Sequence, residues 1–449
     1  MKRFLLAVAL VAAALPLAAQ QANAAQYPDV RTHTLSNGLR VLTLEDRSIP
    51  MISLYVFYRV GSRNERPGIT GVSHLFEHMM FNGSGKFKPK EFDLHLEMAG
   101  SGGNGYTNTD FTAYLETFPK AAIDTVLDLE SDRMKSLLIT PENLEQERGI
   151  VKEERRVRTD NIPRGRMYEE LMAAAFVAHP YNWQVVGWMK DLDAIKLEEA
   201  KRYFNDYYGP NNATLVVVGD FTTADLLKRV ERYFGPIPAR GNILPVVDNE
   251  PEQQGERRVT LEKEAALPAV VVGFKAPPVR HADAPAVELL EAILERGESS
   301  RLYRKLVYGG LATETFATFL GLDHPSLIFL YAQAQEGKTA AQAEKAIDEV
   351  LADIRKNGVT ENELQKARNQ LRARLARETQ TMEGKANLIG TADIRYGSPT
   401  ALFARADQYD KVTRDDIHRV AQSLFVNRAR TVVTLVIPEK AAAAAGGAR

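Results

Sequence analysis

Hydrophobic and polar residues along this chain follow two periodicities, one typical of strands and one typical of helices. Residues 31–36 and 39–45 flank Asn37-Gly38, a dipeptide typical of tight turns, and predict a β-hairpin. Residues 51–60 predict a further strand, and segments with helical spacing of apolar residues follow. Hairpins combined with long helices indicate antiparallel sheets packed with helices, so we predict an α+β fold.

The same order of strands and helices occurs twice in the chain. Short segments of the first half recur in the second, with a helix and then a strand in the same order. The corresponding pairs are Pro50 and Pro268, Thr140 and Thr360, Arg148 and Arg368, and Thr214 and Thr431. We therefore predict two homologous domains, with an accidental match between common helix and strand patterns as the alternative.

The composition of the chain excludes several classes of protein. A chain of 449 residues, 45% hydrophobic and 26% charged, is typical of a multi-domain globular protein. A net charge of −1 provides no basic surface, so no nucleic-acid partner is expected. The chain has no Cys, which excludes disulfides and a lipid anchor attached to cysteine.

The first residues have the pattern of a secretory signal. Lys2-Arg3 precedes the apolar residues 4–17, and Ala22-Asn23-Ala24 resembles a cleavage site. The apolar segment is too short to span a bilayer, so we predict export to a bacterial periplasm without a stable membrane anchor. The predicted boundaries are a signal peptide at 1–24, an N-terminal domain at 25–235, a linker at 236–257, a C-terminal domain at 258–438 and a disordered tail at 439–449.

The strongest chemical signal is the segment His74-Leu75-Phe76-Glu77-His78. On a helix, residues three and four apart are neighbours, so His74 and His78 can bind one cation while Glu77 reaches the water beside it. This H-x-x-E-H order is that of the inverzincins, a class of zinc hydrolases. The alternative is a pair of surface histidines beside a solvated glutamate.

A tetrahedral zinc ion in a catalytic site needs a third protein ligand, which is often a carboxylate. Thr140-Pro141 predicts the start of a helix that carries an acidic run. Glu147 and Glu154 are seven residues apart and share a face of this helix, so one can bind the metal while the other holds a ligand or water. Glu153 points about 100° away from Glu154.

Together these motifs resemble the pitrilysin family of zinc peptidases, and above all its short branch. That branch includes the mitochondrial processing peptidase and bacterial periplasmic zinc proteases. The resemblance implies one zinc ion per chain, with His74, His78 and Glu154 as its ligands. It also implies that Glu77 is the general base and that Glu147 supports the site.

The second copy of the domain lacks these groups. In the alignment of the two halves, Glu147 corresponds to Ala367 and Glu154 to Arg374, and no histidine lies near Glu288 or Ala292, the positions matching His74 and His78. We therefore predict that the second domain binds no zinc.

A glycine-rich loop before residues 111–117 resembles the Asn-Ala-x-Thr loop and substrate-binding edge strand of the same family. Gly105 replaces the alanine here. An edge strand can bind the backbone of an extended peptide with little demand on its sequence. The predicted substrate-binding residues are Asn104, Tyr106, Thr107, Phe111 and Tyr114.

One departure from the family concerns the partner. Val307 and Thr313 stand where the family pattern, after Ser299-Ser300-Arg301-Leu302, has an Arg and a Tyr that hold the substrate carbonyl. We therefore predict a heterodimer with a zinc-less homologous subunit that provides this pair. The alternative is a homodimer in which residues such as Tyr308 or Arg304 take these roles.

The predicted function is that of a zinc-dependent endopeptidase acting on short or unfolded polypeptides, with Glu77 as general base. One alternative is a non-catalytic assembly or scaffold subunit that has kept the peptidase fold. Another is a periplasmic metal-binding carrier, in which Glu77 would have no role.

Overall fold

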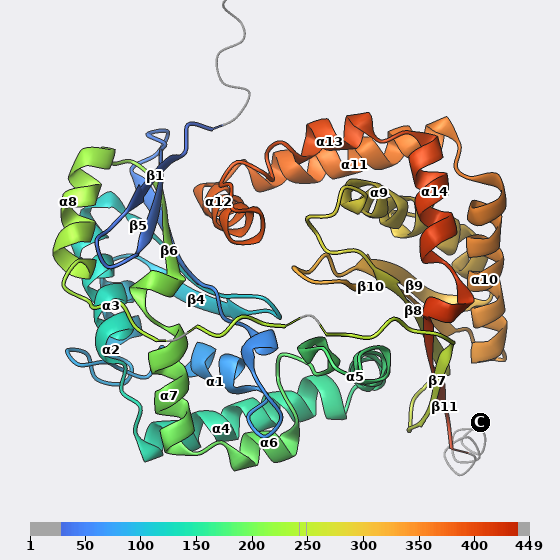
Figure 1. The fold of residues 1–449 in the computed structure, drawn as a ribbon, viewed down its shortest axis with the longest axis horizontal. Helices are drawn as coiled ribbons and strands as arrows, with labels where there is room; N and C mark the ends of the chain where they lie inside the picture. Colours follow the sequence, from blue (N-terminus) through green and yellow to red (C-terminus); the bar gives the residue numbers. More distant parts are fainter. Residues whose placement is uncertain (1–27, 242, 248, 439–449) are drawn as a thin grey trace, which may run out of the picture.

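The computed structural model of the protein describes residues 28–241, 243–247 and 249–438. The predicted signal peptide and the predicted disordered tail lie outside these residues. The chain forms two β-sheets that lie on opposite sides of the molecule, each with helices packed against it (Figure 1). This confirms the prediction of an α+β fold with two related halves.

The first sheet has six strands in the order β1-β2-β6-β3-β5-β4. Asn37 and Gly38 form the turn between β1 and β2, and Gly38 has a φ of 89°, which favours glycine. The predicted hairpin is therefore confirmed. The strands are β1 (Arg31–Thr34), β2 (Arg40–Glu45), β3 (Met51–Tyr58), β4 (Gly102–Thr107), β5 (Thr112–Pro119) and β6 (Ala213–Gly219).

The second sheet has five strands in the order β7-β11-β8-β10-β9. This order and the strand directions repeat those of β2-β6-β3-β5-β4 in the first sheet. The strands are β7 (Arg257–Glu262), β8 (Ala269–Ala276), β9 (Ala312–Phe319), β10 (Ser326–Ala334) and β11 (Arg430–Val436). The sheets differ from the prediction at one pair each, because β2 and β6, like β7 and β11, run parallel.

The first half contains eight α-helices and the second half six among the described residues. Those of the first half are α1 (Val72–Met79), α2 (Glu91–Met98), α3 (Ile123–Ser136), α4 (Pro141–Arg155), α5 (Pro163–Ala175), α6 (Met189–Ala194), α7 (Leu197–Tyr207) and α8 (Thr223–Phe234). Those of the second half are α9 (Ala284–Glu295), α10 (Ala340–Asn357), α11 (Glu361–Glu378), α12 (Met382–Tyr396), α13 (Arg405–Lys411) and α14 (Arg414–Leu424). No helix in this part of the chain is long and apolar enough to cross a membrane.

An arginine contact repeats between the halves. Arg148 on α4 donates to the carbonyl oxygens of Leu192 and Ile195, at the end of α6. In the second half, Arg368 on α11 donates to the carbonyl oxygens of Tyr409 and Val412, at the end of α13. In both halves an arginine side chain therefore donates hydrogen bonds to backbone carbonyls at the C-terminal end of a helix, where carbonyls lack partners within the helix.

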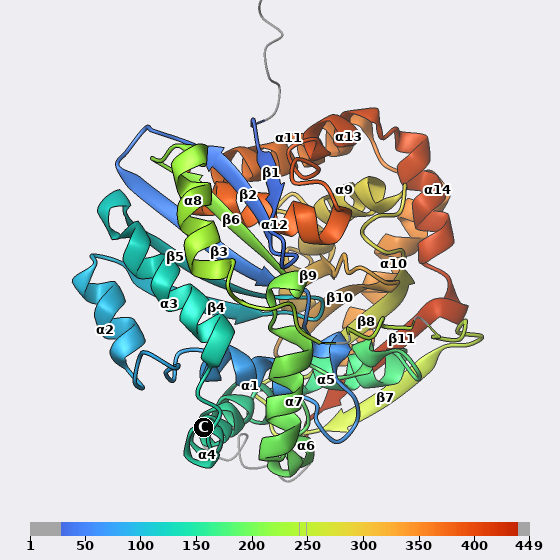
Figure 2. The same ribbon diagram turned by 60° about the vertical axis from the view of Figure 1, so that its left-hand side comes forward.

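One helix from each half packs against the sheet of the other half. Alternate residues of β3 face opposite sides of the first sheet, and Tyr55 and Phe57 pack with Met382 and Ile389 of α12. Reciprocally, Leu171 of α5 packs in a cluster with residues of β8 and β11. Figures 1 and 2 show α12 beside the first sheet and α5 beside the second. This exchange makes the two halves depend on each other for their cores.

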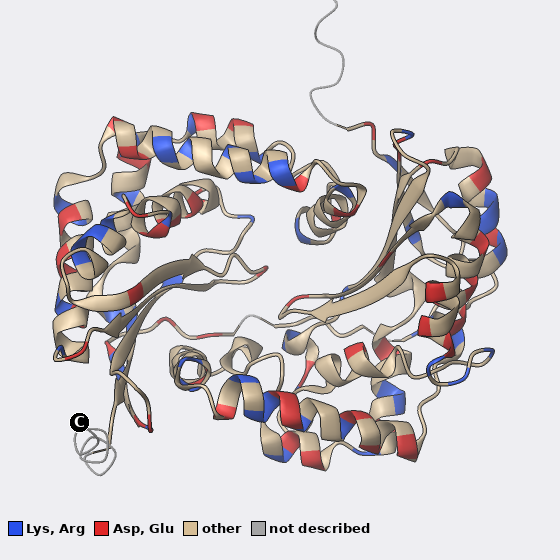
Figure 3. Cartoon of the chain, turned by 180° about the vertical axis from the view of Figure 1, so that it is seen from behind, with Lys and Arg blue, Asp and Glu red and all other residues tan. Residues whose placement is uncertain are grey.

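Buried ion pairs also join the halves. Asp393 on α12 is 2% exposed and accepts hydrogen bonds from Arg40 Nε at 2.9 Å and Arg59 Nη2 at 3.2 Å. At a second junction, the buried Asp110 and the half-buried Asp323 both accept hydrogen bonds from Arg63. Along the outer helices positive and negative residues are interspersed, whereas the strands carry few charges (Figure 3).

We predict that Asp393→Asn destabilises the joined halves. The substitution removes the charge that Arg40 and Arg59 share, and hydrogen bonds to charged groups contribute about 1.5–3 kcal/mol. Urea unfolding should show a loss of this size in the free energy of unfolding. Glu198→Gln breaks an exposed ion pair with Lys201 and should leave the unfolding midpoint nearly unchanged. Equal midpoints for the two variants would contradict this role of Asp393.

Candidate metal centre

Helix α1 begins at a left-handed glycine and is fixed by a buried carboxylate. Gly71, the residue before the helix, has a φ of 90°, and a Cβ there would lie 2.6 Å from the carbonyl oxygen of Val186. Glu65 accepts hydrogen bonds from the backbone N–H groups of Gly71 and Ser73, both at 2.8 Å. These N–H groups have no partner within the helix, so the hydrogen bonds to Glu65 satisfy them and fix the start of the helix, while burial raises the pKa of Glu65 to about 8.

Helix α4 crosses α1 and carries two acidic residues toward it. Thr140 caps its first turn by accepting from the backbone N–H of Asn143, as the Thr-Pro sequence predicts. Helices α1 and α4 pack against each other, which places Glu147 and Glu154 opposite the histidines of α1. Beyond Arg155 the helix continues as a π-helix at Arg156–Asp160.

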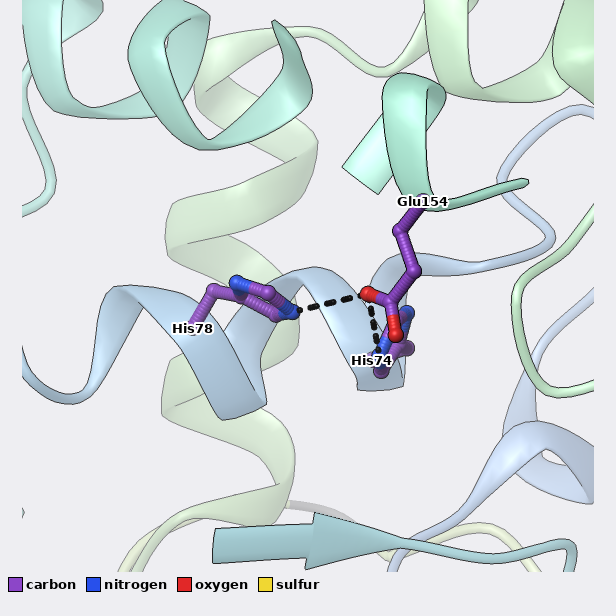
Figure 4. Close-up of side chains that lie close together, drawn as sticks. All are labelled: His74, His78 and Glu154. Carbon is purple, nitrogen blue, oxygen red and sulfur yellow. Dashed lines mark ion pairs between the residues drawn. The ribbon is translucent and has the colours of Figure 1, made fainter. Parts of the chain in front are cut away.

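His74, His78 and Glu154 converge on one point (Figure 4). Each offers one ligand atom, and these atoms lie within 4.8 Å of one another. Glu154 Oε2 is 3.4 Å from His74 Nε2 and 3.4 Å from His78 Nε2. His74 is 9% exposed, whereas His78 and Glu154 are half-buried, so the group is open to solvent on one side.

These distances fit a tetrahedral metal ion. With metal–ligand bonds of about 2.0–2.1 Å, the ligand atoms of a tetrahedral zinc site lie about 3.3–3.4 Å apart. The Glu154 oxygen has this separation from both imidazole nitrogens. Two histidines and one carboxylate, with the remaining position open to solvent, are also a ligand set of catalytic zinc sites. The donor set and the two distances to Glu154 therefore fit a zinc ion.

Further contacts orient His78 and Glu154, whereas Nδ1 of His74 is buried without a hydrogen-bond partner among the described residues. His78 Nδ1 lies 3.4 Å from Glu147 Oε2, which favours a proton on Nδ1 and leaves Nε2 free to face Glu154. Asn82 donates to the other oxygen of Glu147 at 2.5 Å. Arg158 pairs with Glu154 Oε1 at 2.5 Å, so the second carboxylate oxygen is held and Oε2 points to the histidines.

Burial and neighbouring charges act differently on the two imidazoles. Burial lowers the pKa of His74, although the nearby Glu77 opposes this shift. Burial alone would also lower the pKa of His78, but its hydrogen bond and charge interaction with Glu147 raise that pKa above its ordinary value. The same contact, together with Asn82, outweighs burial and lowers the pKa of Glu147. Glu147 is thus held as a carboxylate beside His78.

Glu77 lies on the same helix, next to strand β4. A Cβ placed on Gly105 would lie 3.4 Å from Glu77 Cγ and 3.1 Å from Tyr114 Cδ1, so the backbone of β4 passes close to this glutamate. The absence of a side chain at Gly105 allows this approach. Strand β4 is one of the two edges of the first sheet, since β5 is its single neighbour among the described strands.

The structure corrects the prediction that the strand after residue 111 is the edge. Strand β5 lies between β3 and β4, and Tyr114 and Phe111 are 0% and 2% exposed, so neither side chain is available to a substrate. The edge is instead β4, which contains Asn104, Tyr106 and Thr107. The glycines of β4 led to its prediction as a loop, although an edge strand tolerates them.

Strand β4 has no strand beside it on one side, and one of its side chains is hydrogen-bonded to the second half of the chain. The backbone N–H of Gly105 donates to the Asn104 side chain at 2.8 Å, so this N–H points away from β5 and lies on the open edge. The hydroxyl of Tyr106 donates to Asn387 of α12 at 2.8 Å. Tyr106 thus ties the edge strand to the second half of the chain.

The second half has no comparable metal group among the described residues. Arg374 and Ala367 stand on α11 at the positions aligned with Glu154 and Glu147. Arg301 donates to Glu363 and to the carbonyl of Gly358, which agrees with a structural role for this arginine. Tyr308, in contrast, is 82% exposed.

Three residues around the site were not predicted from the sequence. Asn82 and Arg158 act on the carboxylates of α4, and Glu65 acts on the start of α1. Arg158 follows Glu154 by four residues, a spacing that signals an ion pair on a helix, and it was the only one of the three with such a signal. The other two contacts depend on tertiary packing.

The fold and this metal group together are those of a peptidase family whose members have paired domains. The family model described as Insulinase (Peptidase family M16) matches residues 40–187, and the model described as Peptidase M16 inactive domain matches residues 194–371. The zinc protease PqqE of Helicobacter pylori is 30% identical over 413 residues, which are 91% of this chain and 93% of that protein.

Solved structures of peptidases have the same fold as this chain. A protease from Helicobacter pylori superposes with a TM-score of 0.87 and 30% identity, over 91% of this chain and 99% of that one. The periplasmic protease PqqL of Escherichia coli has the same fold, with a TM-score of 0.75 and 19% identity, over 92% of this chain and 48% of that one. The chain belongs to peptidase family M16, the pitrilysin family that the sequence motifs predicted.

We predict that Glu154→Gln weakens zinc retention far more than Glu153→Gln does. Glu154 lies at the metal position, whereas the side chain of Glu153 is 63% exposed and pairs with Arg156. Glu147→Gln should have an intermediate effect, because the loss of an orienting partner typically costs about 10–100-fold in metal affinity. Competition with a chelator would measure the three affinities. Similar losses at positions 153 and 154 would contradict the assignment.

Proposed function

We propose that this chain is a zinc-dependent endopeptidase with His74, His78 and Glu154 as its zinc ligands. The observation that carries the proposal is the position of Glu154 Oε2, 3.4 Å from the Nε2 atoms of both histidines. The relatives are named zinc proteases, which supports the same metal and the same class of reaction.

The remaining residues have roles in proton transfer and orientation. When bound, the zinc ion supplies Lewis-acid polarisation of the scissile carbonyl and of water beside it. Glu77 accepts a proton from the attacking water and then donates it to the nitrogen of the leaving group. Glu147 holds the imidazole of His78 through Nδ1, and Arg158 holds the free oxygen of Glu154.

The proposed substrates are short or unfolded polypeptides. The open edge of β4 beside Glu77 favours binding of an extended backbone as an added strand. Asn104 and Thr107 lie on this strand at the free edge, and a substrate carbonyl would replace the Asn104 side chain as the acceptor for the outward N–H of Gly105. A compact folded domain has no free extended segment to bind there, so native globular proteins should resist cleavage.

The proposed compartment is the bacterial periplasm. The signal-like residues at the start of the sequence support it, and so does the periplasmic relative PqqL. The second candidate function is that of a non-catalytic subunit that has kept the fold. The complete set of His74, His78, Glu154 and Glu77 favours the peptidase.

The proposed active unit is a heterodimer with a zinc-less homologous chain. Val307 and Thr313 cannot stabilise developing charge, since one is apolar and the hydroxyl of the other lies near Gln333 of the neighbouring strand. A partner would provide the missing donors. A homodimer in which the exposed Tyr308 serves the neighbouring copy is the alternative.

Glu77→Gln should keep its zinc and lose peptidase activity. The amide cannot accept the proton, and loss of a general base typically lowers kcat by about 10²–10⁴-fold. Peptide hydrolysis and zinc content should be measured on the same preparation. Glu97→Gln replaces an exposed glutamate on α2 and should match the wild type in both. If Glu77→Gln retains near-normal kcat, Glu77 is not the base.

Backbone N-methylation of a substrate peptide should raise KM at alternate residues. Strand addition uses the N–H of every second residue, and each lost hydrogen bond contributes about 0.5–1.5 kcal/mol, which corresponds to about 2- to 10-fold in KM. A scan with one methyl group per peptide would reveal this period. Equal KM values at all positions would exclude pairing with β4.

The heterodimer is tested by native mass measurement and by assay of the chain alone. Loss of one donor to the developing charge typically costs about 10²–10³-fold in kcat, so the isolated chain should be weakly active. Addition of the partner should restore full activity. Full activity from a homogeneous preparation of this chain would refute the division of roles.

A further inference from the structure

The second half contains a pocket of about 490 Å³ bounded by α9, β9, α11 and α12. These elements correspond to those around the metal group, because α9, β9 and α11 occupy the places of α1, β4 and α4 in the repeated fold. Glu288 and Arg374, which align with His74 and Glu154, both line this pocket. The second copy has thus lost the ligands but kept a cavity in the corresponding place.

Most charged groups in the pocket wall are paired with each other. Glu288 accepts hydrogen bonds from Arg405 Nε at 3.2 Å and Nη2 at 2.6 Å, and from the hydroxyl of Tyr409 at 2.5 Å. Arg374 donates from Nε to Glu378 at 2.8 Å. Glu288 and Arg374 are thus neutralised by residues of the protein and have little charge left to bind a ligand.

Two opposite charges remain without such partners. Nε of Arg296 is buried without a hydrogen-bond partner among the described residues, and Glu291 lines the same pocket close enough for the charge of Arg296 to act on it. Burial raises the pKa of Glu291 to about 7, and the nearby Arg296 only partly opposes this shift. Keeping a carboxyl group and a guanidinium partly buried without a hydrogen bond between them costs stability, which a ligand with matching charges would offset.

The rest of the lining limits the ligand further. Leucine and phenylalanine side chains from β9, α11 and α12 give the pocket an apolar part beside the two free charges. A volume of this size is typical of sites for small molecules, which occupy about 300–1,000 Å³. The complementary ligand is a small zwitterion with apolar side chains, its ammonium group near Glu291 and its carboxylate near Arg296.

We propose that this pocket binds short apolar peptides with free ends, such as dipeptides. The ligand class follows from the charges and lining of the pocket alone, so the proposal stands whether or not the chain hydrolyses peptides. The position is separate from the metal group, because its walls come from the second half.

The test is calorimetric titration of the zinc-loaded full chain with leucyl-leucine. Saturable binding is expected, with a loss of at least about tenfold when the dipeptide is N-acetylated or its carboxylate is amidated, since each change removes one charge-assisted contact. Glu291→Gln and Arg296→Gln should each cause a similar loss. Glu349→Gln on α10 and Arg377→Gln on α11 lie outside the pocket lining and should bind as the wild type does.

Titrating each variant with the N-acetylated and the amidated dipeptide shows which end of the peptide contacts which residue. N-acetylation should cost little further affinity in Glu291→Gln, and amidation little further in Arg296→Gln, because the matching group is already absent. Failure of the wild type to bind leucyl-leucine, or equal affinity for free and blocked dipeptides, would overturn the proposal. Binding that both variants leave unchanged would also overturn it and would locate the dipeptide elsewhere, such as at β4. None of these results depends on peptidase activity.

Discussion

The site depends on one geometric constraint, the contact between α1 and α4. A tetrahedral metal ion requires the Nε2 atoms of His74 and His78 and one oxygen of Glu154 to lie about 3.3–3.4 Å apart. Two helices from separate parts of the chain must therefore be fixed to within a few tenths of an ångström. Glu65 fixes the start of α1, and Arg148 links α4 to the end of α6.

The two halves of the chain support this contact through their exchanged helices. Helix α12 covers the sheet face opposite to α1, and Tyr106 of the edge strand is bonded to it. The proposed substrate strand therefore depends on the second half, even though that half carries no metal group among its described residues. Duplication has produced one copy that holds the metal residues and one copy that completes the core and keeps a pocket of different chemistry.

Local sequence signals predicted much of the fold and the ligand set. The hairpin at Asn37-Gly38 and the cap at Thr140 are short-range features, and the spacing of His74 and His78 is fixed by the helix itself. The edge position of β4 was missed because its glycines have weak strand preference, and only its pairing with β5 reveals it. The parallel pairs and the exchange of α5 and α12 involve residues far apart in the chain, which no local pattern specifies.

The central claim is that His74, His78 and Glu154 hold one zinc ion with a position open to solvent. An anomalous difference map from a crystal of the zinc-loaded full chain, collected at the zinc absorption edge, tests it most directly. The account predicts one peak per chain, about 2.0–2.2 Å from the Nε2 atoms of both histidines and from Oε2 of Glu154, with no fourth protein ligand. A strongest peak elsewhere, or a fourth protein ligand that closes the site, would contradict it.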